Sequence, residues 1–146
     1  MKRIWKALLP ALLFLGASAV AGDDAWITDY NQALEIAKRE NKVILINFTG
    51  SDWCGWCKRL DREVFSKDTF DDYAEEKLVL LKVDFPKYSK LPQEQMVQND
   101  KLASRYRIRG FPTILMIDAK EQVLLTTGYR PGGPLDYVQH LDEKIK

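Results

Sequence analysis

Cys54 and Cys57 are the two cysteines of this 146-residue chain, and Gly55 and Trp56 separate them. A disulfide across so short a loop adds little stability, because the loop-closure entropy that it removes from the unfolded chain grows with loop length. Small exported proteins that use cysteine as a structural staple usually carry several. We therefore expect this pair to form and break its bond repeatedly, as a redox-active dithiol does.

The cysteines follow a β-branched, apolar run, Val43–Thr49, and they open a segment with helical spacing. A cysteine at a helix N-terminus meets unpaired N–H groups and the positive end of the helix dipole. Such surroundings lower a thiol pKa from about 8.5 into a range of about 3.5–7.5. Cys54 is therefore predicted to be the nucleophile, with Lys58 adding positive charge nearby. Cys57, one turn later, would attack the mixed disulfide and release the reduced substrate.

Two other interpretations of the cysteine pair remain open. One is a static disulfide or a pair of inert thiols. The other is a metal site, but a structural zinc site needs four Cys or His ligands, and His140 is the one histidine available. Two thiolates alone can hold Cu(I), so a copper-handling module is an alternative. The redox interpretation requires no cofactor and no metal, and we expect none.

The N-terminus has the pattern of an export signal. Three basic residues among the first six positions precede an apolar stretch, Ala7–Gly16. Ala19-Val20-Ala21 then fits an A-x-A cleavage site, with Ala17-Ser18-Ala19 as a second possible site. The apolar stretch is shorter than the roughly 20 residues of a membrane span. We predict a signal peptide over residues 1–21 rather than a retained anchor, a domain over 22–146, and a periplasmic or secreted location.

Charge and length narrow the class of protein further. The chain has 22 basic and 21 acidic side chains, and residues 1–21 contain three basic and no acidic ones, so the mature chain has a formal charge of −2. Without a basic stripe, nucleic acid and anionic membrane surfaces are poor partner candidates. The length suits one domain. We expect a soluble monomer.

Hydrophobic periodicity predicts an element order of αβαβαββα. The predicted helices are Asp29–Glu40 with Thr28 as N-cap, Cys54–Phe65, a piece from Ser66 or Asp68 to Glu76, about Pro92 to Tyr106, and Leu135–Ile145 with Leu135, Val138, Leu141 and Ile145 inward. The predicted strands are Val43–Thr49, Leu78–Asp84, Thr113–Ile117 and Val123–Thr127, the last two as an antiparallel hairpin. Strand–helix–strand connections imply parallel pairing elsewhere, so the fold class is α/β with a mixed central sheet and helices on both faces.

Two stretches resemble known segments of the thioredoxin superfamily. Phe48–Lys58 (FTGSDWCGWCK) resembles the active-site stretch, and Tyr106–Thr113 (YRIRGFPT) resembles the stretch before the fourth strand of that family. Gly128 matches a family glycine as well. The resemblance extends from about Val43 to the C-terminus, and the active-site stretch is similar to that of exported bacterial thioredoxin-like proteins. It implies a thioredoxin-like fold and a thiol–disulfide oxidoreductase activity.

The resemblance also implies roles for residues around the cysteines. Pro112 would follow a cis peptide bond and pack beside the two sulfurs, where the residues alone would suggest an ordinary turn. Phe111 would leave its backbone free to pair with an extended substrate segment. Trp53 and Trp56 would form an apolar rim around Cys54 for partly folded clients, and Gly55 is expected to take part in substrate binding.

This chain departs from the family at the residue that handles protons. The family buries an acid in the strand before the motif and pairs it with a lysine of the next strand. Here the corresponding residues are Asn47 and Leu80, or Lys82 if the strands are shifted by one residue. An amide does not act as a general base. The substitutes that the sequence offers are Asp84, Asp52 and Glu63.

The leading functional hypothesis is a reductase or general interchange enzyme for disulfides of exported proteins, kept reduced by a membrane electron donor. The alternatives are a disulfide oxidase or isomerase, or a non-catalytic client-binding or copper-binding module on the same fold. The segment Phe85–Asp100 is longer than in thioredoxin. We expect a solvated loop with an extra helical turn there, with a partner-binding insert as the alternative.

Overall fold

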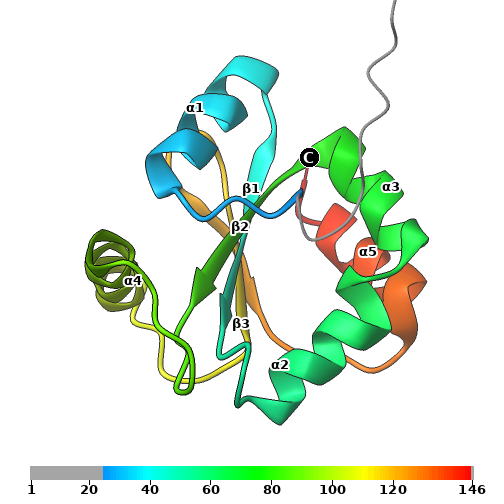
Figure 1. Ribbon diagram of the computed structural model, residues 1–146. Helices are drawn as coiled ribbons and strands as arrows, with labels where there is room; N and C mark the ends of the chain where they lie inside the picture. The colour runs from blue at the N-terminus through cyan, green and yellow to red at the C-terminus, as the bar shows by residue number, and fades with distance from the viewer. Residues whose placement is uncertain (1–24, 146) are drawn as a thin grey trace, which may run out of the picture.

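Four strands of the described chain form one mixed sheet (Figure 1). The computed structural model describes residues 25–145, so the predicted signal peptide and the domain start at residue 22 lie outside the described residues. The order across the sheet is β2-β1-β3-β4. β1 pairs in parallel with β2 and antiparallel with β3, and β3 pairs antiparallel with β4. The bounds are β1 Val43–Thr49, β2 Leu78–Asp84, β3 Thr113–Ile117 and β4 Val123–Thr127, as the sequence predicts.

Helices cover both faces of this sheet, which confirms the predicted fold class (Figure 1). One face carries α1 (Tyr30–Glu40) and α4 (Gln93–Arg105), and the other carries α2 (Gly55–Leu60), α3 (Asp68–Lys77) and α5 (Gly133–Asp142). A π-helical turn, η2 (Asp61–Phe65), continues α2, so the predicted helix ends at Phe65 but changes its hydrogen-bonding pattern midway.

β1 is buried on both faces because it lies between β2 and β3. Ile44, Ile46 and Phe48 pack toward α1 and α4. Leu45 packs on the opposite side with α2, α3 and α5. A strand covered on both faces needs an almost continuous apolar sequence, which explains the run that precedes the cysteines.

The N-cap of α1 is one residue later than predicted. The Asp29 carboxylate accepts the backbone N–H of Gln32 at 2.8 Å and thereby caps the helix in place of Thr28. The carbonyl of Thr28 instead accepts the side-chain amide of Gln98 from α4. Asn41 ends the helix as predicted, in the left-handed conformation with φ of 52°. Tertiary contacts therefore shifted the cap between two residues that are both good candidates.

The prediction of Leu135 as a core residue of the last helix is wrong. α5 begins at Gly133 and ends at Asp142, and Leu135 is 58% exposed. Tyr137 and Leu141 are the buried side chains of this helix. The Tyr137 hydroxyl donates to the carbonyl of Gly128 at 2.9 Å, and this contact orients the helix with Leu135 outward.

The topology gathers four loops at one edge of the sheet. β1, β2 and β4 all end at this edge, and antiparallel β3 begins there. The loops concerned are residues 50–54, 85–92, 106–112 and 128–132. Because the first of these contains Cys54, and the third contains the segment around Pro112, the two family-like stretches are brought to one place by the strand order alone.

Candidate active site

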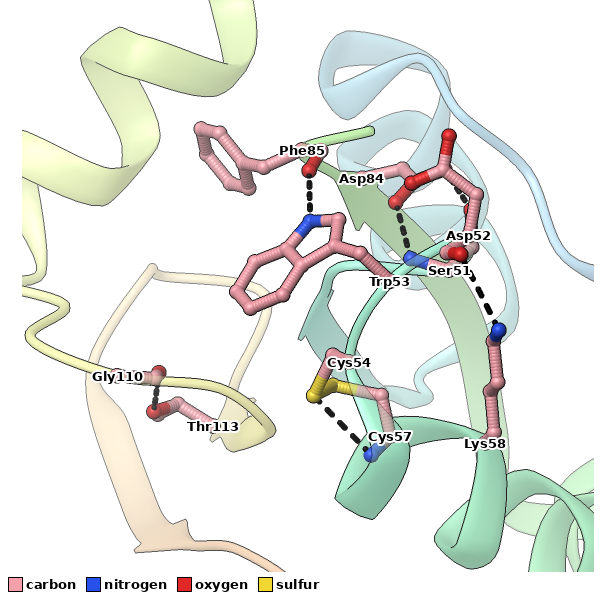
Figure 2. The surroundings of a disulfide bond; sticks show 10 residues. All are labelled: Ser51, Asp52, Trp53, Cys54, Cys57, Lys58, Asp84, Phe85, Gly110 and Thr113. Atoms are coloured by element: carbon pink, nitrogen blue, oxygen red, sulfur yellow. Dashed lines mark hydrogen bonds between the residues drawn. A yellow bond between two sulfur atoms is a disulfide. The ribbon is translucent and has the colours of Figure 1, made fainter. Parts of the chain in front are cut away.

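The two cysteines form a disulfide at the start of α2 (Figure 2). Cys54 is the N-cap residue with an extended backbone, and its Cα lies 5.2 Å from that of Cys57. The backbone N–H of Cys57 donates to Cys54 Sγ at 3.2 Å. The predicted position of Cys54 at a helix N-terminus is therefore observed, with a helix N–H directed at its sulfur.

Cys57 lies on the inner side of the pair. Cys54 is 6% exposed and Cys57 is 5% exposed, so both are buried in the oxidised form. Cys57 also lines a cavity of about 70 Å³ between β1, β2 and the helix. The other residues around this cavity are Asn47, Thr49, Ser51, Lys58, Asp61 and Lys82.

Trp53 connects three of the converging loops (Figure 2). Its indole N–H donates to the carbonyl of Phe85 at 2.8 Å, and its ring meets Phe111 edge-on at 5.9 Å between centroids. The Lys87 ammonium lies 3.9 Å from the ring centroid, a cation–π contact. Trp53 is half-buried. It therefore braces the site and offers less rim surface than predicted.

The peptide bond between Phe111 and Pro112 is cis, which confirms the expectation from the resemblance. The Thr113 hydroxyl donates to the carbonyl of Gly110 at 2.7 Å and closes this turn. Gly128 packs closely against the backbone of Pro112. A Cβ at Gly128 would lie 3.1 Å from the Pro112 carbonyl oxygen. The contact between Phe111 and Trp53 places the turn beside the cysteine loop.

Trp56 is an exposed aromatic residue next to Cys57. It is 55% exposed, and its ring lies 5.0 Å from that of Tyr129. The Arg59 guanidinium lies over both rings, at 5.4 Å and 5.1 Å from their centroids. Glu63 accepts the Tyr129 hydroxyl and the Arg59 guanidinium, and these bonds lower the pKa of its carboxyl. Gly55, also exposed, leaves the approach to the disulfide open.

Asp52 fastens the 85–92 loop to the cysteine loop. Its carboxylate accepts the backbone N–H groups of Lys87, Tyr88 and Ser89 at 2.8–2.9 Å. Desolvation works to raise the pKa of Asp52, but these bonds outweigh it and hold that pKa at about 2. The predicted solvated loop is thus observed at residues 85–92, tied to the site edge by Asp52, and the rest of the long segment belongs to α4.

The strand register decides between the two partners offered for Asn47. Asn47 pairs in register with Lys82, so the alternative with Lys82 is confirmed and the alignment with Leu80 is wrong. The three substitutes offered by the sequence are engaged outside the cavity. Asp84 accepts the Ser51 backbone N–H and hydroxyl, Asp52 holds the loop, and Glu63 holds Arg59 and Tyr129.

Sequence reasoning missed the residues that only the fold brings to the site. Tyr129 follows β4, Phe85 and Lys87 follow β2, and neither motif contains them. No local pattern could have identified them, because strand order brings each of them to one of the two tryptophans that flank Cys54 and Cys57. Asp61 could have been found by its i,i+4 spacing from Cys57 on the predicted helix.

Residues 25–145 contain no group of three or more His, Cys, Asp or Glu side chains placed to hold a metal ion. His140 lies on α5, where its ring contacts the Thr127 hydroxyl at 3.2 Å.

None of the helices within residues 25–145 is long and apolar enough for a membrane crossing.

The fold, the cysteine pair at the start of α2 and the cis-proline turn define a thioredoxin-type thiol–disulfide oxidoreductase. A family model for the thioredoxin-like domain matches residues 30–142, and the chain belongs to this family. The disulfide bond reductase DsbH of Chlamydia pneumoniae is 37% identical over 117 residues, which are 80% of this chain and 70% of DsbH.

Solved structures agree with this assignment. A DsbH oxidoreductase structure superposes with a TM-score of 0.78 at 32% identity, covering 89% of this chain and 92% of that one. A thioredoxin from Thermus thermophilus has a TM-score of 0.61 at 18% identity, covering 80% and 83% of the two chains, and shares the fold.

Proposed function

We propose that this chain reduces disulfides of exported proteins, with Cys54 as the nucleophile and Cys57 as the resolving cysteine. The observation that carries the proposal is the Cys54–Cys57 disulfide at the start of α2, with the Cys57 N–H donating to Cys54 Sγ at 3.2 Å. A donor aimed at sulfur favours the thiolate, and the thiolate is the form that attacks disulfides.

The reaction begins with both cysteines reduced. The Cys54 thiolate attacks one sulfur of a client disulfide, a mixed disulfide forms, and the other client sulfur leaves as a thiolate. Cys57 loses its proton and attacks Cys54 Sγ, which releases the second client thiolate. Two electrons pass to the client, and the enzyme ends with the Cys54–Cys57 bond present in this structure.

Client binding is proposed for the residues around the sulfurs. An extended client segment pairs with the backbone of Phe111, before Pro112, as a short added strand. Trp56 supplies apolar contact, since it is 55% exposed beside the disulfide. Gly55 lets the client backbone approach, and Trp53 holds the Phe111 turn at the required distance.

Direction and location are part of the same proposal. The name of the similar protein from Chlamydia pneumoniae, disulfide bond reductase, supports reduction rather than oxidation. The predicted signal peptide supports a periplasmic or secreted location, where a membrane dithiol donor would return Cys54 and Cys57 to the reduced form. The proposed working form is a monomer with protein clients and no nucleic-acid partner.

Equilibration with glutathione buffers tests the direction. We expect a reduction potential near −270 mV, typical of a reductant, whereas a value near −120 mV would identify an oxidant. Insulin reduction tests the residues. Cys54→Ser should abolish turnover, and Cys57→Ser should accumulate a mixed disulfide visible by mass spectrometry. Turnover that survives Cys54→Ser would contradict the assignment of this site.

A further inference from the structure

The cavity beside Cys57 contains a buried polar atom that needs a partner. Asn47 is 8% exposed, and its Oδ1 has no hydrogen-bond partner among the described residues. The cavity that Asn47 lines measures about 70 Å³. A water molecule needs roughly 10–15 Å³ of such space and a polar lining. The amide oxygen and the volume together favour a hydrated cavity in contact with Cys57.

The lining of this cavity leads from the thiol to the surface. Cys57 is buried, whereas Asp61 is exposed to solvent and lies one helical turn further along the same side. The Asp61 backbone N–H donates to the Cys57 carbonyl, so the helix holds the two residues in this relation. Among the described residues that line the cavity, Asp61 alone carries a carboxylate.

We propose that Asp61 accepts the proton of Cys57, through water in this cavity, during the resolving step. This inference rests on the proposed roles of the two cysteines. The Cys57 thiol gives its proton to water, which passes a proton to the Asp61 carboxylate. The freed electron pair of Cys57 forms the bond to Cys54 Sγ, the mixed disulfide breaks, and the client leaves as a thiolate. Asp61 then returns the proton to solvent.

The other charged groups around the cavity support this direction of proton transfer. Lys82 from β2 faces Asn47 across the parallel strand pair, and Lys58 lies on α2. Ammonium groups near a thiol favour its ionised form. Asp84 reaches the cavity only through Ser51, whose N–H and hydroxyl it accepts. Asp61 therefore supplies the carboxylate on the described wall of this cavity.

The two chemical steps can be measured separately with 5,5′-dithiobis-(2-nitrobenzoate). Mixing the reduced protein with this disulfide in a stopped-flow instrument releases one thionitrobenzoate as Cys54 attacks and a second as Cys57 resolves. Asp61→Asn should leave the first phase unchanged and slow the second about 10²-fold at pH 7, the lower end of a general-base contribution. The difference should shrink as pH rises, because hydroxide replaces the carboxylate.

Matched variants separate this role from a structural one. Asp61→Glu keeps the carboxylate and should retain the fast second phase. Asp100→Asn removes an exposed carboxylate from α4, on the other face of the sheet, and should change neither phase. Asn47→Asp should restore the second phase in the Asp61→Asn background, because it places an acid inside the same cavity.

The outcomes distinguish this inference from the proposed function. If the rate of the second phase is the same in Asp61→Asn and Asp100→Asn between pH 6 and 9, the role of Asp61 is refuted, while the proposed roles of the cysteines are not affected. A first phase that survives Cys54→Ser would instead refute the proposed roles of the cysteines. Circular dichroism and the thermal midpoint of Asp61→Asn should match wild type, and a loss of folding would assign Asp61 a structural role.

Discussion

The effect of Gly50→Ala on the free energy of unfolding should depend on Trp53. The substitution should destabilise the protein when the Trp53 indole is present and stabilise it when the indole is absent. A Cβ built at Gly50 overlaps the Trp53 indole, where even the most distant of the three clashing atoms, Cζ2, is 2.7 Å away. Overpacking of this kind costs about 1–3 kcal/mol. Gly50 does not have a positive φ, so alanine fits its backbone and stabilises by about 0.4–1 kcal/mol through the unfolded chain. Gly50→Ala should therefore lower the free energy of unfolding by up to about 2.6 kcal/mol.

The same substitution should stabilise the protein when the indole is absent. In a Trp53→Ala background the added methyl group meets no ring, so Gly50→Ala should raise stability by about 0.4–1 kcal/mol. Guanidinium unfolding of the four oxidised proteins gives the coupling energy from a double-mutant cycle. The thermal midpoint should move by about 4 °C per kcal/mol for a domain of this size. An equal loss of stability in both backgrounds would refute the close approach of Gly50 to Trp53.

Three further substitutions test other parts of the site edge. Asp52→Asn should make stability depend less on pH in the acid range. The pKa of Asp52 in the folded protein, about 2, lies below the usual value of about 3.9. The ionised Asp52 carboxylate therefore stabilises wild type fully above about pH 4, and this stabilisation is lost as pH falls through 2. Thermal midpoints from pH 2 to 6 measure this, and parallel profiles for the two proteins would contradict it. Tyr137→Phe should lower the free energy of unfolding by about 0.5–1.5 kcal/mol, because it removes the hydrogen bond from the Tyr137 hydroxyl to the half-buried Gly128 carbonyl. Tyr88→Phe, at an 82% exposed position, is the control for denaturant unfolding and should stay within about 0.5 kcal/mol of wild type. Trp56→Ala should raise the KM for insulin several-fold with little change in kcat, since its exposed ring is proposed to bind clients without touching the reacting sulfurs; a fall in kcat alone would argue against that role.

Local pattern sufficed for most elements of the fold. The apolar run of β1 and the hairpin pattern of β3 and β4 predicted strand bounds that the structure reproduces. The position of Cys54 before a helix, and the resemblance around Pro112, located the two halves of the site before any tertiary contact was known. These features depend on short-range chemistry: backbone periodicity, helix capping and the spacing of two thiols.

Helix ends and helix faces were less predictable, because neighbours in space decide them. Thr28 and Asp29 are both suitable N-caps, and in the structure Asp29 caps the helix while the Thr28 carbonyl accepts the Gln98 amide of α4. Leu135 fits the apolar periodicity of the last helix, yet the hydrogen bond from Tyr137 to Gly128 turned it outward. Periodicity restricts a helix to a few orientations, and packing selects among them.

The cysteine pair and its expected redox chemistry follow from the sequence by itself, because two thiols three residues apart at the start of a helix can form and break a disulfide. The surroundings that govern the chemistry follow only from tertiary structure. Strand register set Lys82 rather than Leu80 opposite Asn47, and strand order brought Tyr129 to Trp56. The wall of the Cys57 cavity is built from β1, β2 and the helix together. No single segment of the sequence determines these surroundings, because proton transfer and client contact depend on distances between residues that are far apart in the chain.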